Sequence, residues 1–470
     1  MLGLTYKHII GITATLLLIT LVGAYSGRRV KTSSDFAVGG KKAGRGIVAG
    51  TIMGTLVGGA STIGTAQLAF MYGFSAWWFT LGAGLGCLLL GSFFSGPLYR
   101  TDRETLPQML EEEFGALSKP ISSLFVSLGT FLNIIAQILA ATALITSMFS
   151  VGHLAAALIA IVLMSAYVIF GGVWGAGFVG VAKLILLYAS VIAGGIIAIS
   201  CGGGIGRFID VFPRQPYFSL FGRGIWIDGA AGFSLVLGVL STQTYAQAVL
   251  SGRTLKESKA GALISACLIP PIGIAGIFIG LFMKMNHPDI DSAMAFPKFV
   301  MDYMDPWLGG IVLATLLVTV VGTGAGLSLG ISTIFTKDIY ANYINTKADD
   351  GLLLIVSRIV IVVTLALALL FTLGSAKSLI LKWSFMSMGL RGATIFAPLC
   401  AALFFKGRVS SGFAVAAMIV SPLSVLLGKF ILPPGFDPLF PGIAISFLLI
   451  FLGMAAKGKQ CSSDAEEIIE

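Results

Sequence analysis

The chain has 470 residues, of which 56% are hydrophobic and 11% are charged, and its formal net charge is +9. Soluble domains carry about a quarter charged residues, so this composition excludes an ordinary soluble protein. Apolar runs of about 20 residues recur along the whole length, and each is long enough to cross a bilayer. Most Lys and Arg lie between these runs, where the positive-inside rule explains them without a nucleic-acid partner. We therefore expect an all-α polytopic membrane protein.

Thirteen membrane spans are predicted, which places the two termini on opposite sides of the membrane. They cover approximately residues 9–26, 47–72, 75–98, 120–148, 152–172, 176–201, 230–250, 261–284, 308–334, 352–374, 378–404, 410–430 and 437–456. The loop after the first span holds Arg28, Arg29 and Lys31, which indicates a cytoplasmic loop. This predicts a plasma-membrane protein with its N-terminus outside and a polar, disordered cytoplasmic tail at 457–470. A short amphipathic helix is expected to begin near Pro107.

Two spans are unusually rich in glycine and hydroxyl side chains. One begins GIVAGTIMGTLVGGASTIGTAQ, and the other leads into residues 319–340, TVVGTGAGLSLGISTIFTKDIY. In the first of these spans the glycines disfavour a continuous helix, and a helix broken at membrane depth presents carbonyls that can bind cations. In the second, small residues let other backbones approach closely, and hydroxyls and carbonyls can ligate a small hard cation. At 1.5 Å per residue, Gly54, Val57 and Thr323 lie about 10–16 Å from the cytoplasmic ends of their spans. They can share one layer, with Lys337-Asp338 in water below; the alternative is close helix packing through small residues.

Two of the basic residues inside predicted spans matter more than the glycines. Arg391 is about 13 residues from either end of its span, and its charge there needs a partner or a wet cavity. The apolar interior offers no obvious Asp or Glu, so the predicted partner is an anionic group of a solute; the alternative is satisfaction by backbone carbonyls. Lys183 lies in the layer of Gly54 and Thr323, where its amine either extends to the interface or occupies the cation site.

An enzyme is not expected. The five cysteines make neither a metal motif nor a disulfide framework, and no glycine cluster ends in the Gly-Lys-Ser/Thr of a phosphate loop. No Ser/His/Asp set can be assembled within the spans. We therefore expect no cofactor and no metal other than a coupling ion.

Short motifs along nearly the whole chain resemble those of the sodium:solute symporter family, whose members carry sugars, proline, pantothenate, monocarboxylates, iodide and sialic acid. They are Ser34-Asp35-Phe36 with Gly39-Gly40, Ile63-Gly64 with Tyr72-Gly73, Thr105-Leu106-Pro107 with Phe114-Gly115, Tyr167 with Phe170-Gly171-Gly172-Val173-Trp174, and Ser332-Thr333-Ile334 with Thr336-Lys337-Asp338-Ile339-Tyr340. Each motif is short, and their order along the chain makes the resemblance specific.

The resemblance implies a leucine-transporter-type core of two inverted five-helix repeats. Its expected divisions are an extra helix and loop at 1–46, the repeats at 47–201 and 202–404, two peripheral helices at 405–456 and the tail at 457–470. The sodium ligands it implies are Gly54, Val57, Thr319 and Thr323, with Gly322 at the place of a hydroxyl ligand that glycine lacks. The substrate pocket it implies lies near Ser61, Thr242, Gln243 and Arg391.

Two departures from the family pattern concern the cation. An acidic residue that many members carry falls at Gly180, which argues against a second sodium there. Lys183, three residues on, lies on the same helical face and could act as a cation surrogate. We therefore carry Lys183 as a candidate site residue alongside the sodium ligands.

These implications predict a secondary active transporter that imports a small organic solute, carboxylate-bearing, by Na⁺ symport through alternating access. The alternative within this class is a proton-coupled or cation-independent carrier that uses Lys183. A membrane sensor or scaffold and a channel are alternatives of other classes, and neither a signalling domain nor a selectivity-filter repeat is evident. The expected partners are the solute, Na⁺ and the lipid bilayer, while the solute's identity and the oligomeric state stay open.

Overall fold

The computed structural model describes residues 4–27, 41–101, 103, 105–375, 378–433 and 436–467. Side chains are described throughout these ranges except at 20, 22–27, 168–180, 429 and 459–467. The predicted loop charges Arg28, Arg29 and Lys31, and the motif from Ser34 to Gly40, lie outside the described residues. The side chains of the motif from Phe170 to Trp174 lie outside them as well.

The described chain is helical, and its only bridge between extended residues joins Ala43 and Gly252. In chain order the helices are α1 (Tyr6–Gly27), α3 (Arg45–Leu56), η2 (Ala60–Gly64), α4 (Thr65–Tyr72), η3 (Gly73–Trp77), α5 (Trp78–Leu89), η4 (Leu90–Phe94), α6 (Ser95–Tyr99), α7 (Leu106–Phe114), α8 (Ser118–Phe149), α9 (His153–Cys201), α10 (Ile205–Val211), α11 (Arg214–Tyr217), α12 (Ile225–Leu240), α13 (Gln243–Leu250), α14 (Leu255–Asn286), η5 (Ser292–Met294), α15 (Ala295–Tyr303), α16 (Pro306–Ile334), η6 (Phe335–Ile344), α17 (Asp350–Leu373), α18 (Ile380–Phe404), α19 (Ser411–Ile431) and α20 (Leu439–Glu467).

Within these described ranges, nine helices are long and apolar enough to cross a membrane, and the bent pair α12 and α13 would make a tenth. Two shorter apolar helices, Tyr6–Ile19 and His153–Tyr167, add to them. Helices suit this environment because every backbone polar group must be satisfied without water in the hydrocarbon region. The all-α, multi-pass architecture predicted from the apolar runs is confirmed, and the count of thirteen spans stays a prediction.

Two predictions about particular segments are wrong. Helical backbone continues through α9 from His153 to Cys201, across residues 173–175, which were expected to separate two spans. Helical backbone also continues in α20 as far as Glu467, into the tail that was predicted to be disordered. In the tail, residues compatible with a helix extend the neighbouring apolar helix, because each further residue adds one hydrogen bond to an existing turn. In α9 the helix continues although glycines at 171, 172 and 175 disfavour it locally.

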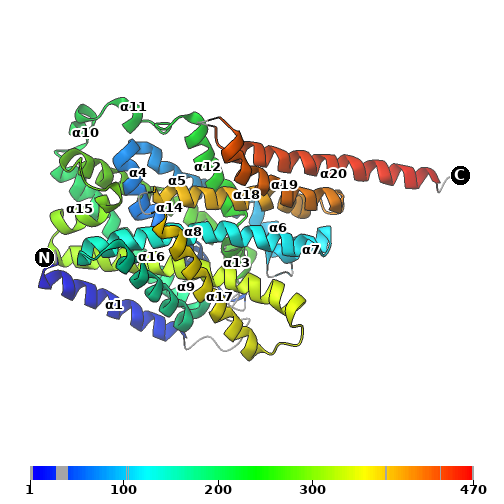
Figure 1. The fold of residues 1–470 in the computed structure, drawn as a ribbon, viewed down its shortest axis with the longest axis horizontal. Coiled ribbons are helices and arrows are strands. Elements are labelled where there is room, and N and C mark those ends of the chain that lie inside the picture. The colour runs from blue at the N-terminus through cyan, green and yellow to red at the C-terminus, as the bar shows by residue number, and fades with distance from the viewer. Residues whose placement is uncertain are drawn as a thin grey trace.

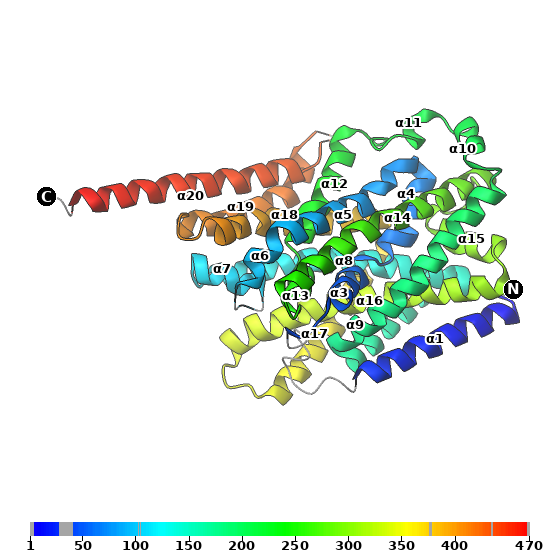
Figure 2. The same cartoon turned by 180° about the vertical axis from the view of Figure 1, so that it is seen from behind.

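The helices lie roughly along one direction, so the molecule has two ends (Figures 1 and 2). One end, here called the N-terminal face, carries the N-terminus, α10, α11 and α15. The other, here called the opposite face, carries α7 and the turn between η6 and α17. Helix α16 packs against α1, α8 and α9, and α18 packs against α8 and α12. The centre of the molecule is therefore built around α8, α16 and α18.

Helix α7 shows how local sequence sets an element boundary at the opposite face. The Thr105 side chain accepts a hydrogen bond from Gln108 N, and proline follows in the first turn. Thr105 is therefore the N-cap. The proline lacks an N–H, but N–H groups in the first turn have no intrahelical partner, so its absence there is harmless. The helix ends at Gly115, whose φ of 87° favours glycine. The short helix predicted near Pro107 is confirmed.

Two membrane helices are interrupted near their middles. Helix α3 ends at Leu56 and a π-helical turn begins at Ala60. Helices α12 and α13 meet at a 44° bend around Ser241 and Thr242. Each break lies in the first span of one of the predicted repeats, 47–201 and 202–404, a division that stays a prediction along with the flanking segments.

Candidate cation and solute site

One hydrogen bond from a neighbouring helix and two local ones satisfy the backbone at the first break. Gly59 N donates to Gln137 Oε1 of α8 at 2.8 Å, and the hydroxyls of Ser61 and Thr62 both donate to Gly58 O at 2.9 Å. Val57, with φ −89° and ψ 96°, leaves the helical region. A helix end leaves carbonyls without intrahelical donors, so this break presents backbone oxygens inside the protein.

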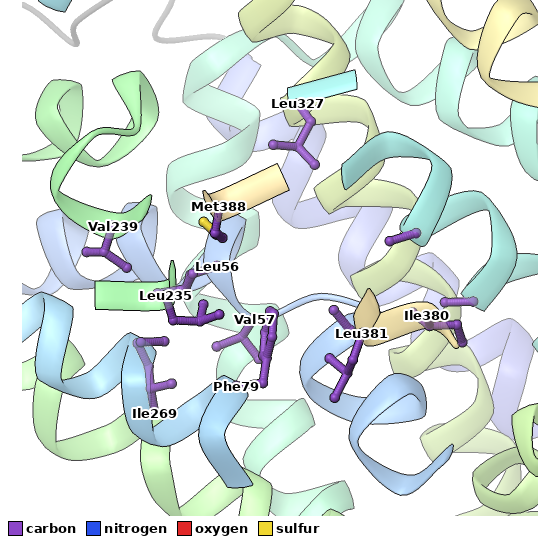
Figure 3. Packing of buried hydrophobic residues seen from close by; sticks show 14 of the residues in the cluster. Leu56, Val57, Phe79, Leu235, Val239, Ile269, Leu327, Ile380, Leu381 and Met388 are labelled. Atoms are coloured by element: carbon purple, nitrogen blue, oxygen red, sulfur yellow. The ribbon is translucent and has the colours of Figure 1, made fainter. Parts of the chain in front are cut away.

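The break fits closely between two neighbouring helices. A methyl group placed on Gly59 would overlap Ala140 Cβ, and one on Gly58 would lie 2.9 Å from Thr323 Oγ1. Figure 3 shows Val57 beside Phe79 in the apolar core around the break. The side chain of Val57 is thus packed, and only its backbone could serve a cation.

We expect Gly59→Ala to lower the stability of the protein by about 1–3 kcal/mol, the usual cost of overpacking. The reason is the contact with Ala140, which cannot yield without moving α8. The thermal unfolding midpoint in detergent would measure this. Gly46→Ala is the matched control, because no atom lies within 4 Å of its added methyl. Equal midpoints for the two variants would contradict the close fit.

The amine of Lys183 lies among three of the four predicted cation ligands. Its Nζ is 2.8 Å from Gly54 O, 3.2 Å from Thr319 O and 3.3 Å from Thr323 Oγ1. The residue is 3% exposed, and Thr319 and Thr323 are buried as well. Helices α3, α9 and α16 therefore meet at this amine, which lies inside the protein and not at its surface.

Gly322 contributes no side-chain oxygen to this cluster. A methyl placed on it would meet only Tyr167, at 3.7 Å, which is ordinary contact. The Thr319 hydroxyl is buried and has no hydrogen-bond partner among the described residues. The oxygens that surround the Lys183 amine are thus the carbonyls of Gly54 and Thr319 and the hydroxyl of Thr323. Thr319 also carries a hydroxyl.

Arg391 is fully buried on α18, and neutral groups hold its guanidinium. Nη1 donates to Thr242 Oγ1 at 2.8 Å, Nη2 donates to Ser387 Oγ at 2.9 Å, and Nε donates to Ser387 O at 3.2 Å. The Met388 sulfur lies 3.2 Å from Nη2. Within the described parts of the chain no carboxylate forms an ion pair with Arg391. The guanidinium is therefore hydrogen-bonded, while its charge lacks a counter-ion among the residues that the structure describes.

The structure distributes the four predicted solute residues over three places. Thr242 lies at the second break and contacts Arg391. Ser61 lies in η2 at the first break. Gln243 begins α13, where its Oε1 accepts a hydrogen bond from Leu106 N at the start of α7. Gln243 therefore joins the second break to the opposite face.

Sequence reasoning missed a polar network that runs between the two breaks. Gln137 Nε2 donates to Asn133 Oδ1 at 3.3 Å, and Ser384 Oγ donates to the same oxygen at 3.0 Å. Ser384 is one turn from Ser387, which contacts Arg391. We define the polar network by these residues and its two ends at the breaks: Gly59, Gln137, Asn133, Ser384, Ser387, Arg391 and Thr242. Its signal in the sequence is Asn133 and Gln137, four residues apart in an apolar span and so on one helical face.

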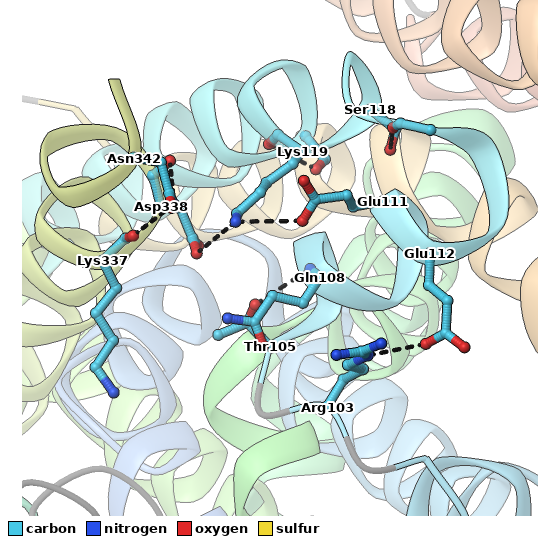
Figure 4. Close-up of polar contacts among 12 residues, drawn as sticks. Arg103, Thr105, Gln108, Glu111, Glu112, Ser118, Lys119, Lys337, Asp338 and Asn342 are labelled. Carbon is cyan, nitrogen blue, oxygen red and sulfur yellow. Dashed lines mark hydrogen bonds and ion pairs between the residues drawn. The ribbon is translucent and has the colours of Figure 1, made fainter. Parts of the chain in front are cut away.

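A cluster of charges lies at the opposite face, where α16 ends (Figure 4). Lys119 Nζ is 3.2 Å from Glu111 Oε2 and 4.0 Å from Asp338 Oδ1. The expectation that Asp338 lies in water is wrong, because it is 1% exposed beneath α7 and α8. Near its rim, hydrogen bonding from Arg103 holds the pKa of Glu112 below its usual range. The cluster joins α7, α8 and η6, so it ties the end of the cation-site helix to its neighbours.

Comparison with known proteins assigns the chain to a family. The model of the sodium:solute symporter family matches residues 36–421. The chain belongs to this family. Family membership confirms that the protein is a membrane transporter and not an enzyme. Na⁺ is the coupling ion of this family, and no other cofactor is expected.

Relatives of this family member are distant but extend over most of its length. The sodium/proline symporter of Escherichia coli (strain K12) is 22% identical and aligns with 91% of this chain and 90% of its own. The sodium/glucose cotransporter of Vibrio parahaemolyticus is 24% identical over 90% of this chain and 86% of its own. A solved Na⁺-coupled sialic acid symporter, substrate-bound and outward-open, superposes with a TM-score of 0.79 at 19% identity, covering 97% of this chain and 98% of its own. The fold of this symporter is thus the leucine-transporter-type fold that the motifs implied.

Proposed function

We propose that this symporter is a secondary active transporter that takes up a small, carboxylate-bearing organic solute by alternating access. The observation that carries the proposal is Arg391, which is fully buried and whose partners among the described residues are all neutral. A buried charge is costly unless it is paired. A solute carboxylate would supply the missing anion and could bind the guanidinium in a bidentate arrangement.

The polar network supplies hydrogen-bonding groups that such a solute would need. Ser384, Ser387 and Arg391 lie on one face of α18, because residues three and four apart share a face. Helix α8 covers that face, since a methyl on Gly129 would be 2.6 Å from Arg391 Cγ. Asn133 and Gln137 follow on α8. Amide and hydroxyl groups on facing helices can recognise a polar solute, while Ser61, Thr242 and Gln243 would complete the pocket near the breaks.

Alternating access supplies the movement. The solute would bind between the two broken helices, and rearrangement around them would expose it to one side of the membrane at a time. The proposed orientation has the N-terminal face outside, as the loop charges predicted. Under this proposal the cluster of Lys119, Glu111 and Asp338 lies on the cytoplasmic side.

Two candidates exist for coupling. Symport with Na⁺ is the expectation that family membership brings, with Gly54, Val57, Thr319 and Thr323 as ligands. The second candidate is a carrier of the same fold that works without a free cation at this site. The observation that favours it is the position of Lys183 Nζ, within hydrogen-bond distance of three of those four residues.

A binding screen with the purified protein tests the solute class. We expect a carboxylate from a small library to raise the thermal unfolding midpoint, because ligand binding to the folded state stabilises it. The library would also contain sugars, amino acids and vitamins, each measured in Na⁺ and in K⁺ at equal ionic strength. For every hit, the matching primary amide is the control. A hit whose amide stabilises equally well would contradict recognition through a carboxylate.

A further inference from the structure

The hydrogen bonding of Lys183 is complete within the predicted cation site. A lysine ammonium has three N–H donors and no acceptor, and three oxygens lie within reach of Nζ, at 2.8 Å, 3.2 Å and 3.3 Å. Two of these are the carbonyls of Gly54 and Thr319, and the third is the hydroxyl of Thr323. Donors and acceptors match one to one, in a residue that is 3% exposed.

A free cation would need the same oxygens. Hard cations bind oxygen ligands at short distances, about 2.3–2.6 Å for Ca²⁺, which is close in size to Na⁺. The three oxygens already lie at hydrogen-bond distances from Nζ. An ion at their centre would overlap the amine, and two positive charges so close repel strongly in a low-dielectric interior. The amine and Na⁺ therefore exclude each other.

The covalent tether favours the amine in this competition. A group linked by a short chain acts at an effective concentration in the millimolar range or above, and it does not diffuse away. Displacing it would leave a charged group among the apolar side chains of α9, where residues 184–187 are Leu-Ile-Leu-Leu. Such a group is expensive within a membrane unless it finds new partners. The family pattern also implies a hydroxyl ligand at position 322, where this chain has a glycine and none to offer.

We propose that Lys183 is the resident cation of this site and keeps free Na⁺ out of it. The fixed charge joins α3, α9 and α16 in the place where a soluble ion would otherwise join them. Truncation of Lys183 should then create a Na⁺ site from oxygens that are already in position. The inference rests on the proposed function, because it takes the site to belong to a solute carrier. It adds that the cation in the site of that carrier is a side chain of the protein itself.

Binding of ²²Na⁺ to the purified full-length protein, without any solute, tests the inference. We expect Lys183→Ala to bind ²²Na⁺ saturably, at least tenfold above the wild-type signal, in a scintillation proximity assay. Thr323→Ala introduced into the Lys183→Ala protein should reduce that signal severalfold, because it removes the side-chain oxygen that contacts the amine in the wild type. Since no solute is added, failure of the carboxylate proposal would not affect the result.

Lys284→Ala is the matched control for the loss of a lysine. Its amine lies over the Phe70 ring, 4.8 Å from the centroid and away from the cation site, so this variant should bind ²²Na⁺ like the wild type. A folded Lys183→Ala protein that binds no more ²²Na⁺ than the wild type would overturn the inference. If Lys183→Ala does not fold, the wild type and the single variant Thr323→Ala are compared instead. Saturable ²²Na⁺ binding by the wild type that Thr323→Ala abolishes would equally overturn the inference, because Na⁺ would then occupy the site with Lys183 in place.

Discussion

Arg391→Gln is expected to weaken binding of a carboxylate solute by roughly 30-fold or more, the equivalent of about 2–5 kcal/mol for one partner of a buried charge pair. Glutamine is shorter and neutral but can still bond to hydroxyl groups. It can keep a contact with Thr242 or Ser387, so the protein should still fold and insert. The loss would come from the missing positive charge, because the solute carboxylate would then be buried without a counter-ion.

The experiment compares affinities for the best carboxylate from the screen and for its primary amide. The amide should bind the wild type and Arg391→Gln with similar affinity, since it brings no charge to lose. Arg358→Gln, a change of the same kind at an exposed position on α17, is the matched control and should keep wild-type affinity. If the carboxylate binds Arg391→Gln as tightly as the wild type, Arg391 has a purely structural role.

Lys119→Met is expected to lower the free energy of unfolding by about 3–5 kcal/mol, the usual result of removing one partner of a buried ion pair. Asp338 is 1% exposed, and Lys119 is the positive group 4.0 Å from its carboxylate. Without Lys119 that carboxylate would be left buried and uncompensated. Equilibrium unfolding in detergent, or the thermal midpoint, would measure the loss.

Two further variants separate the charge effect from a packing effect. Asp338→Asn in the Lys119→Met background should recover part of the lost stability, because it removes the uncompensated charge. Lys406→Met breaks an exposed pair with Glu112, whose side chains are 72% and 43% exposed, and should change stability by less than about 1 kcal/mol. Equal losses for Lys119→Met and Lys406→Met would show that burial of Asp338 does not depend on its lysine.

The depth of residues along the membrane could be predicted from the sequence, because each helical residue adds a fixed 1.5 Å. Counting from the span ends placed Gly54, Thr323 and Lys183 in one layer, and the structure brings all three into contact. Glycine and hydroxyl patterns likewise predicted the first break, since such residues disfavour a continuous helix. The cap at Thr105 and the stop at Gly115 fixed α7 for similarly local reasons.

Neighbours across helices could not be predicted in the same way. Which face of a membrane helix meets which partner depends on packing between helices, and lipid is as apolar as the residues that pack. The partners of Arg391, the polar network through Gln137 and Asn133, and the burial of Asp338 beside Lys119 all depend on that packing. The sequence by itself thus determined an all-α membrane protein with a basic residue at the depth of a cation site. Only the tertiary structure decided that the amine of Lys183 lies among the oxygens of that site, because it takes three separate helices to surround it.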